Sequence, residues 1–184
     1  MNRSEASATA DASFFLDECY RTILKSSSFT SMKLHRLETK QWLPISKEEA
    51  WGFFSVPENL DRITPPEMSF EIKSGQGEPT YAGQIISYRI RPILNIPMAW
   101  VTEITQVVSG SYFIDEQRFG PYRFWHHMHR FEESNGGVLM HDVLHYALPF
   151  GVLGEIAGGF VHRKVQGIFA FRTEELNRIF PSKP

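Results

Sequence analysis

The chain has 184 residues, of which 42% are hydrophobic and 22% charged, and its formal net charge is −2 at pH 7. This length is sufficient for one domain with a proper core and too short for two. The small net charge gives no electrostatic reason to expect nucleic acid or an anionic membrane as a partner. Cys19 is the single cysteine, which excludes an internal disulfide and favours a reducing, cytoplasmic location. No apolar run approaches the roughly 20 residues of a membrane-spanning helix.

Residues 1–31 differ from the rest of the chain because they are rich in Ser, Ala and Thr. Their few apolar side chains, Phe14 and Leu16 among them, fit one short amphipathic helix. Met32 follows directly and precedes the first strand-like run. We therefore expect residues 1–31 to be a poorly ordered extension and residues 32–184 to form the domain.

The first predicted strand covers residues 33–43, where polar and apolar residues alternate until a proline ends the run. Ser46 then has the features of a helix N-cap, and Glu49 three residues later completes a capping box. This helix ends before Pro57, and residues 58–63 predict a second short helical piece. The pair resembles a DNA-binding helix-turn-helix in shape alone, because it carries no basic recognition face.

Further strand candidates follow in quick succession at residues 69–73, 83–91, 98–107 and 111–119. Their short connections contain Gly, Pro or Asn, as antiparallel neighbours require. The register of the last of these strands stays open, because a shift by one residue exchanges its two faces. The residues facing inward are either Phe113, Asp115 and Gln117, or Ile114, Glu116 and Arg118.

Residues 120–149 contain two alternating runs on either side of Asn135-Gly136, and Asn-Gly in this position is the strongest short-range hairpin signal. A tight turn there places His129 opposite Asp142. Directly opposed residues share a face, so one face carries Trp125, His127, His129, Phe131, Met140, Asp142, Leu144 and Tyr146. The other face carries Phe124, His126, Met128, Arg130, His141, Val143 and His145. An apolar face with a few convergent polar groups is typical of a small-molecule pocket.

From Gly151 onward apolar residues recur at helical spacing, which predicts a long amphipathic helix that ends near Pro181. Charged residues, Arg172 among them, fall between the apolar positions. Glycines in its first turns, such as Gly154 and Gly158, leave space beside the sheet, although each costs about 1 kcal/mol of helix stability relative to Ala. An antiparallel sheet of about seven strands with its helices on one side is an α+β domain.

Several short motifs occur in order between Met32 and the end of the chain. They are Gln41-Trp42-Leu43-Pro44-Ile45, Pro57-Glu58-Asn59-Leu60, Ile63-Thr64-Pro65-Pro66, Trp100-Val101-Thr102-Glu103-Ile104, Asp115-Glu116-Gln117, Gly120-Pro121-Tyr122 and Pro149-Phe150-Gly151. Together with the alternation in the hairpin, they resemble uncharacterised bacterial ligand-binding proteins of the SRPBCC superfamily (START, pollen-allergen-like and polyketide cyclase-like proteins). The resemblance implies a helix-grip fold, in which a strongly curved antiparallel sheet wraps the C-terminal helix and encloses an apolar cavity. It does not imply a particular substrate.

The inward-facing histidines allow three interpretations. His127 and His129 could ligate a metal with Asp142 as the third ligand, because imidazole suits zinc or iron. We favour a second interpretation, in which Asp142 accepts a hydrogen bond from His129 and no metal or other cofactor is needed. The third is acid–base catalysis, as in polyketide cyclases, in which Glu103 takes part if it points inward.

We therefore expect the domain to bind a small hydrophobic or amphipathic molecule, such as a lipid, quinone or polyketide, as a carrier or sensor. The alternatives are a polyketide cyclase- or dehydratase-like enzyme, and a dimerising interaction module with a collapsed interior. The protein is expected to be a monomer or a homodimer, and no catalytic residue is assigned. The candidate ligand-binding residues are Trp100, Glu103, Trp125, His127, His129, Phe131, Asp142, Leu144, Tyr146 and Phe160.

Overall fold

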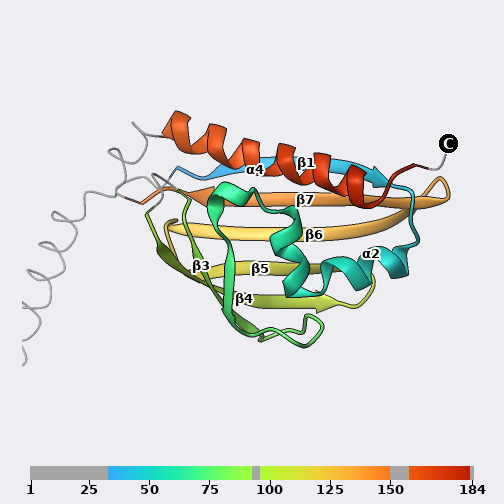
Figure 1. Cartoon of the computed structure of the whole chain (residues 1–184), viewed down its shortest axis with the longest axis horizontal. Coiled ribbons are helices and arrows are strands. Elements are labelled where there is room, and N and C mark those ends of the chain that lie inside the picture. Colours follow the sequence, from blue (N-terminus) through green and yellow to red (C-terminus); the bar gives the residue numbers. More distant parts are fainter. Residues whose placement is uncertain (1–32, 93–95, 150–157, 183–184) are drawn as a thin grey trace, which may run out of the picture. The chain divides into compact units, whose positions relative to one another are not determined.

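A computed structural model describes residues 33–92, 96–149 and 158–182, which form a curved sheet with helices on one face (Figure 1). In chain order the elements are β1 (His35–Leu43), α2 (Lys47–Phe54), the 3-10 helices η1 (Pro57–Ile63) and η2 (Pro66–Met68), β2 (Glu71–Ser74), β3 (Ile85–Ile90), β4 (Met98–Val108), β5 (Tyr112–Phe119), β6 (Phe124–Ser134), β7 (Gly137–Ala147) and α4 (Gly158–Ile179). This is the α+β architecture expected from the sequence. Residues 1–31 lie outside the described residues, so their separation from a 32–184 domain stays a prediction.

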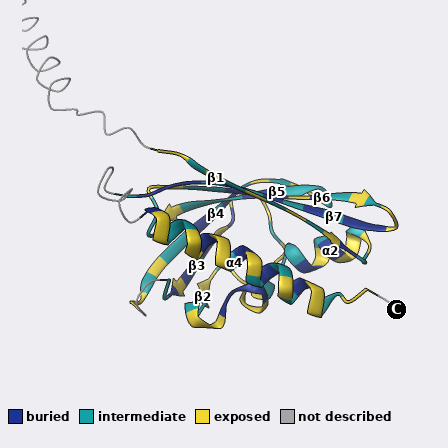
Figure 2. Ribbon diagram, turned by 90° about the horizontal axis from the view of Figure 1, so that it is seen from above, coloured by how far each residue is buried: buried dark blue, intermediate teal, exposed yellow. Residues whose placement is uncertain are grey.

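The sheet is antiparallel throughout, with the strand order β1-β7-β6-β5-β4-β3-β2. Strands β2 to β7 form a meander, and β1 joins its edge beside β7. The pairing of β4 with β5 is irregular between Val101 and Thr102 and again between Ile104 and Gln106. Such bulges bend a strand and increase its twist. The sheet accordingly curves around α4, as seen from above in Figure 2.

The hairpin of β6 and β7 has the predicted turn and register. Asn135 and Gly136 have φ values of 50° and 74°, both positive as the two-residue type I′ turn requires. His129 lies opposite Asp142, and His127 lies opposite a leucine. Seven of the eight side chains predicted for the inner face are buried, and the eighth, Trp125, is half-buried. The face assignment of the hairpin is therefore confirmed.

The register left open for β5 is resolved by its pairing with β6. Asp115 lies opposite His127, and Phe113 lies opposite His129. Opposed residues share a face, and both histidines face inward, so Phe113 and Asp115 face inward as well. Arg118 lies on the outer face at an exposed position. The pairing thereby places a carboxylate directly beside the histidines.

The segment after β1 forms the expected helices, with one difference in type. The Oγ atom of Ser46 accepts a hydrogen bond from the Glu49 backbone N–H at 3.1 Å, so the predicted N-cap of α2 is present. The second helical piece, η1, is a 3-10 helix. It begins at Pro57 and ends at Ile63, and the hydroxyl of the C-cap residue Thr64 donates to the Leu60 carbonyl at 2.7 Å. This geometry suits a short segment that prolines bracket on both sides.

Helix α4 packs against the inner face of the sheet along most of its length. Its buried residues are Gly158, Val165, Phe169, Arg172 and Leu176. The amide of Gln41 on β1 donates to the Thr173 carbonyl at 3.0 Å and connects the helix to the edge strand. The burial of Arg172 differs from the expectation that it lies among solvated charged residues. The predicted helical residues before 158, including Gly151 and Gly154, lie outside the described residues.

Among the helices of the described residues, none is both long enough and apolar enough to cross a bilayer.

Gly137 provides a test of how closely β7 packs against β1. A Cβ atom at this position would lie 2.4 Å from the Leu43 carbonyl oxygen and 2.7 Å from a ring carbon of Trp42. The backbone must therefore move, and we expect Gly137→Ala to lower the free energy of unfolding by about 1–3 kcal/mol. Gly52 on α2 is the matched control, since a Cβ there meets nothing within 4 Å.

Gly52→Ala should leave the free energy of unfolding unchanged or raise it by up to about 1 kcal/mol, because alanine favours the helix. Urea denaturation of both variants and the parent chain measures the difference. Equal stability of Gly137→Ala and the parent would contradict the close approach of β1 and β7.

Candidate functional site

A cavity of ≈ 730 Å³ lies between the inner face of the sheet and α4. Its walls come from η1 and η2, from the inner faces of β3 to β6, and from α4. Most of the lining is apolar, as at Leu60, Ile63 and Ile86. Small-molecule sites usually measure roughly 300–1,000 Å³. The volume of this cavity therefore falls within the range of small-molecule sites.

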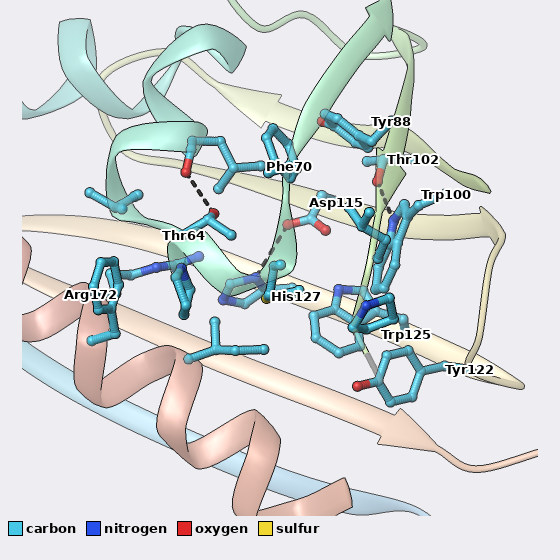
Figure 3. A pocket seen from close by; sticks show the side chains of 18 of the residues that line it. Thr64, Phe70, Tyr88, Trp100, Thr102, Asp115, Tyr122, Trp125, His127 and Arg172 are labelled. Carbon is cyan, nitrogen blue, oxygen red and sulfur yellow. Dashed lines mark hydrogen bonds and ion pairs between the residues drawn. The ribbon is translucent and has the colours of Figure 1, made fainter. Parts of the chain in front are cut away.

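Aromatic side chains form one side of the cavity (Figure 3). The ring centroids of Trp100 and Trp125 lie 5.1 Å apart with planes at 89°, and the Tyr122 centroid lies 4.8 Å from that of Trp125. Trp100 Nε1 donates to Thr102 Oγ1 at 2.9 Å, so its polar edge is satisfied within β4. Burial and the neighbouring Tyr146 raise the pKa of Tyr122 far above its usual value. This side of the cavity is therefore rigid and uncharged.

A cluster of histidines and carboxylates forms the middle of the inner wall. His127 Nε2 lies 3.1 Å from Asp142 Oδ1, and His129 Nε2 lies 3.0 Å from Asp115 Oδ2, both with hydrogen-bond geometry. The remaining nitrogens also face carboxylates, since His127 Nδ1 is 3.4 Å from Asp115 Oδ2 and His129 Nδ1 is 2.8 Å from Asp142 Oδ1. The last contact is short but misaligned, so among the described residues His129 Nδ1 has no hydrogen-bond partner. The histidine that makes a hydrogen bond to Asp142 with good geometry is thus His127, whereas His129 was predicted from the sequence.

Arg172 of α4 completes the polar wall. Its Nη1 atom lies 3.5 Å from Asp142 Oδ1, and its guanidinium lies over the Phe169 ring, 5.0 Å from the centroid. The residue is 7% exposed, and it lines the cavity. Within the described part of the chain, its buried Nε and Nη1 atoms have no hydrogen-bond partner. A buried cation with free donors can bind a carboxylate, phosphate or sulfonate oxygen.

Electrostatics keeps the buried carboxylates ionised. Burial alone would raise the pKa of Asp115, but hydrogen bonds and positive charge from His127 and His129 outweigh it and hold the pKa below its usual range. Burial acts in the same direction on Asp142, where the positive charges of Arg172 and His129 and the hydrogen bond from His127 bring the pKa well below normal. Burial lowers the pKa of His127, yet its two carboxylate partners raise it overall.

The structure separates the predicted ligand-binding residues into two groups. The residues that line the cavity are Trp100, Trp125, His127, His129 and Phe160. Phe131 and Leu144 are fully buried in the hydrophobic core. Asp142 lies behind the histidines, and the Tyr146 hydroxyl is 2.7 Å from His162 Nδ1 on α4. These last four residues share the predicted face without forming the cavity surface.

Glu103 lies on the outer face of the sheet, and its expected position in the cavity is corrected. Its Oε2 atom is 2.5 Å from Arg118 Nε, in an ion pair with a partly exposed partner. Glu103 is three residues from Trp100, and alternation along a strand puts such positions on opposite faces. The inward orientation that catalysis by Glu103 would need is therefore not present.

From the sequence, the orientation of Asp115 stayed undetermined, and Arg172 and Tyr122 were not predicted to line the cavity. The inward orientation of Asp115 follows only from the register of β5 against β6. Arg172 follows Val165 by seven residues and precedes Leu176 by four, so the helical period itself placed it on the buried stripe. For Tyr122 we find no comparable signal, because it stands in the connection between β5 and β6.

Comparison with solved structures gives the fold. The ginseng major latex-like protein 151 from Panax ginseng matches with a TM-score of 0.60 and 11% identity, over 81% of this chain and 99% of that chain. Protein Ms6760 from Mycobacterium smegmatis matches with a TM-score of 0.57 and 15% identity, over 78% and 89% of the two chains. No protein-family model and no curated protein matches the sequence. The chain therefore has the SRPBCC-type helix-grip fold, and identities this low carry no information on its ligand.

The charge cluster predicts how stability varies with pH. The depressed pKa values of Asp115 and Asp142 stabilise the fold above the unfolded carboxyl pKa of about 4, and this contribution is lost as the pH falls through the folded pKa values. The raised pKa of His127 stabilises the fold below about 6.5, and this contribution is lost as the pH rises through the folded pKa. We therefore expect the cluster to contribute most between about pH 4.5 and 6.5.

Urea denaturation between pH 3 and 9 measures this profile. Asp142→Asn should flatten the acid limb of the free energy of unfolding, and His127→Gln should flatten the alkaline limb. His141→Gln is the control, since this histidine lies on the outer face of β7 and forms no part of the cluster. Profiles of the Asp142 and His127 variants parallel to that of the parent would show that the cluster does not couple folding to pH.

Proposed function

We propose that this helix-grip domain binds a small molecule with an apolar body and one anionic or oxygen-rich group. The observation that carries the proposal is a buried guanidinium, that of Arg172, which lines an otherwise largely apolar cavity. The ligand class expected from the sequence, a small hydrophobic or amphipathic molecule, is thereby narrowed toward an amphipathic anion.

The apolar body of the ligand would lie against the aromatic side of the cavity. Trp100, Trp125 and Ile86 present carbon surface there, and burial of apolar ligand area contributes about 25 cal/mol per Å² before the costs of association. The polar group would reach Arg172, which Figure 3 shows on the other side of Asp115 and His127 from the tryptophans. Apolar burial therefore supplies affinity, and Arg172 fixes the orientation.

Basic residues also occur where α4 borders the cavity. Arg163 and Lys164 line it from exposed positions on the helix, close in sequence to the half-exposed Phe160. Exposed cations beside an opening attract anions and raise the rate of association. They support the proposed preference for a negatively charged ligand.

The structure supports the two alternative functions, an interaction module and an acid–base enzyme, less well than ligand binding. An interaction module with a collapsed interior is disfavoured by a cavity of ≈ 730 Å³. For acid–base catalysis, His127 and His129 are available, because both line the cavity and have carboxylate partners. Glu103 is not available, because its side chain points away from the cavity to the outer face of the sheet. Binding without chemistry therefore remains the function that the geometry supports best.

Gly167 offers a way to fill the cavity without disturbing the core. It lines the cavity on α4, and a Cβ there would meet nothing within 4 Å. We expect Gly167→Phe to weaken binding of 8-anilinonaphthalene-1-sulfonate at least about 10-fold, because a ring displaces the probe, while helix stability is unchanged or raised. Gln166→Phe is the control, since this neighbouring exposed position does not line the cavity. Fluorescence titration measures both, and equal dissociation constants for the two variants would place the probe elsewhere.

The role of Arg172 is tested with a pair of probes that differ in charge. N-phenyl-1-naphthylamine has the ring system of 8-anilinonaphthalene-1-sulfonate without the sulfonate. We expect Arg172→Gln to weaken binding of the sulfonate about 10-fold or more, since a hydrogen bond to a charged group contributes about 1.5–3 kcal/mol. The neutral amine should bind parent and variant alike, and it reports any loss of the folded cavity. An equal loss for both probes would contradict an anion-binding role for Arg172.

A further inference from the structure

Three potential metal ligands converge on the cavity wall at distances that a metal ion would impose. His129 Nε2 and His127 Nδ1 lie 3.0 Å and 3.4 Å from Asp115 Oδ2, and the three residues each offer one ligand atom within 4.8 Å of those of the other two. Around a zinc-like ion with bonds of about 2.0–2.2 Å, neighbouring ligand atoms are separated by roughly 2.9–3.5 Å. The distances of 3.0 Å and 3.4 Å from the histidine nitrogens to Asp115 Oδ2 therefore fall within the range expected for two ligands of one metal ion.

Rigid backbone holds these ligands in place. His127 and His129 are two residues apart on β6 and so share its inner face, and Asp115 on β5 is the direct partner of His127. Both strands are internal to the sheet and are paired on each side. Ligands on paired strands keep their spacing better than ligands on loops.

A second carboxylate lies behind both imidazoles and is hydrogen-bonded to His127. Asp142 Oδ1 lies 3.1 Å from His127 Nε2 and 2.8 Å from His129 Nδ1, which are the nitrogens that do not face the centre of the site. Arg172 in turn lies 3.5 Å from the same oxygen. Histidines that ligate metals almost always present their other nitrogen to a carboxylate, a carbonyl or water in this way.

The placement of protons also leaves contacts that a cation would relieve. A neutral imidazole has one N–H, so His127 can donate to Asp142 and His129 to Asp115. The remaining lone pairs then face carboxylate oxygens, His127 Nδ1 at 3.4 Å from Asp115 Oδ2 and His129 Nδ1 at 2.8 Å from Asp142 Oδ1. Satisfying every contact by protons instead would require two imidazolium rings whose centroids are 3.9 Å apart in a buried site, where like charges repel. A metal ion among the three ligand atoms replaces the extra protons and removes the conflict.

We propose that Asp115, His127 and His129 form a binding site for one divalent transition metal ion. With neutral imidazoles, the two carboxylates and the guanidinium of Arg172 leave the site with one net negative charge, which favours a divalent cation. Two imidazole nitrogens and one carboxylate oxygen suit zinc, iron or cobalt better than magnesium or calcium. All three residues line the cavity, so the remaining coordination positions face it. The site does not depend on the ligand binding proposed above.

The experiment uses the full chain without a histidine tag, stripped with a chelator and titrated with Co²⁺. We expect one Co²⁺ per chain, with visible d–d absorption bands of a low-symmetry nitrogen–oxygen site. Asp115→Asn and His129→Gln should each weaken binding more than about 100-fold, which exceeds the 10–100-fold effect of second-sphere changes. Circular dichroism shows whether each variant remains folded.

The matched control replaces the histidine pair on the opposite face of the same hairpin. His126 and His145 are direct cross-strand partners, with ring centroids 6.2 Å apart. The double variant His126→Gln/His145→Gln should keep the parental Co²⁺ affinity. Loss of binding in this control, or parental affinity in folded Asp115→Asn or His129→Gln, would overturn the proposed site.

A second measurement does not depend on how the inner variants fold. X-ray absorption of the Zn²⁺-loaded His126→Gln/His145→Gln chain should show two imidazole ligands and at least one further oxygen ligand. Fewer than two imidazoles, or no saturable Co²⁺ binding up to about 1 mM, would overturn the proposal. A metal site that persists when Gly167→Phe has abolished dye binding would leave this proposal intact and separate it from the proposed function.

Discussion

The buried carboxylate of Asp142 is the point on which the inner wall depends. It lies within 3.1 Å of a nitrogen of His127 and of His129 on β6, and within 3.5 Å of Arg172 on α4. An ionised carboxylate with almost no exposed surface is tolerated only where such partners compensate its lost hydration. The same contacts hold the imidazole rings in place and connect the helix to the hairpin. The arrangement that keeps Asp142 ionised therefore also determines which atoms face the cavity.

The cavity exists because the sheet bends more than one helix can fill. The bulges where β4 pairs with β5 bend this part of the sheet, and α4 packs mainly beside β1 and the hairpin, as Figures 1 and 2 show. Helices η1 and η2 cover part of the remaining opening without filling it. Close packing is thus restricted to the two hydrophobic clusters, around Phe131 and around Leu144. The predicted residues that proved to be core, rather than cavity lining, belong to these clusters.

The sequence determined the hairpin well and the remaining strands less well, for a physical reason. An Asn-Gly turn fixes register, and register fixes the faces, so the inward positions of His127, His129 and Asp142 could be predicted. The register of β5 depends on a connection without such a turn signal, and Asp115 therefore stayed open. Glu103 was placed inward although its separation from Trp100 contradicted that position. Arg172 was missed because charge was given more weight than helical spacing, whereas its partner Asp142 makes its burial possible.

The polar wall also restricts what the cavity can hold. A pure hydrocarbon beside Arg172 would leave buried N–H groups without partners, at a cost of about 1–3 kcal/mol or more for a charged group. An anionic group satisfies them, and a divalent ion held by Asp115 and the histidines would strengthen that preference, because it turns the net negative charge of the wall positive. The two effects act through different atoms, since the guanidinium belongs to α4 and the proposed metal ligands belong to β5 and β6. An anion selected by Arg172 alone would keep its affinity without the metal, whereas an anion that coordinates the metal would lose it.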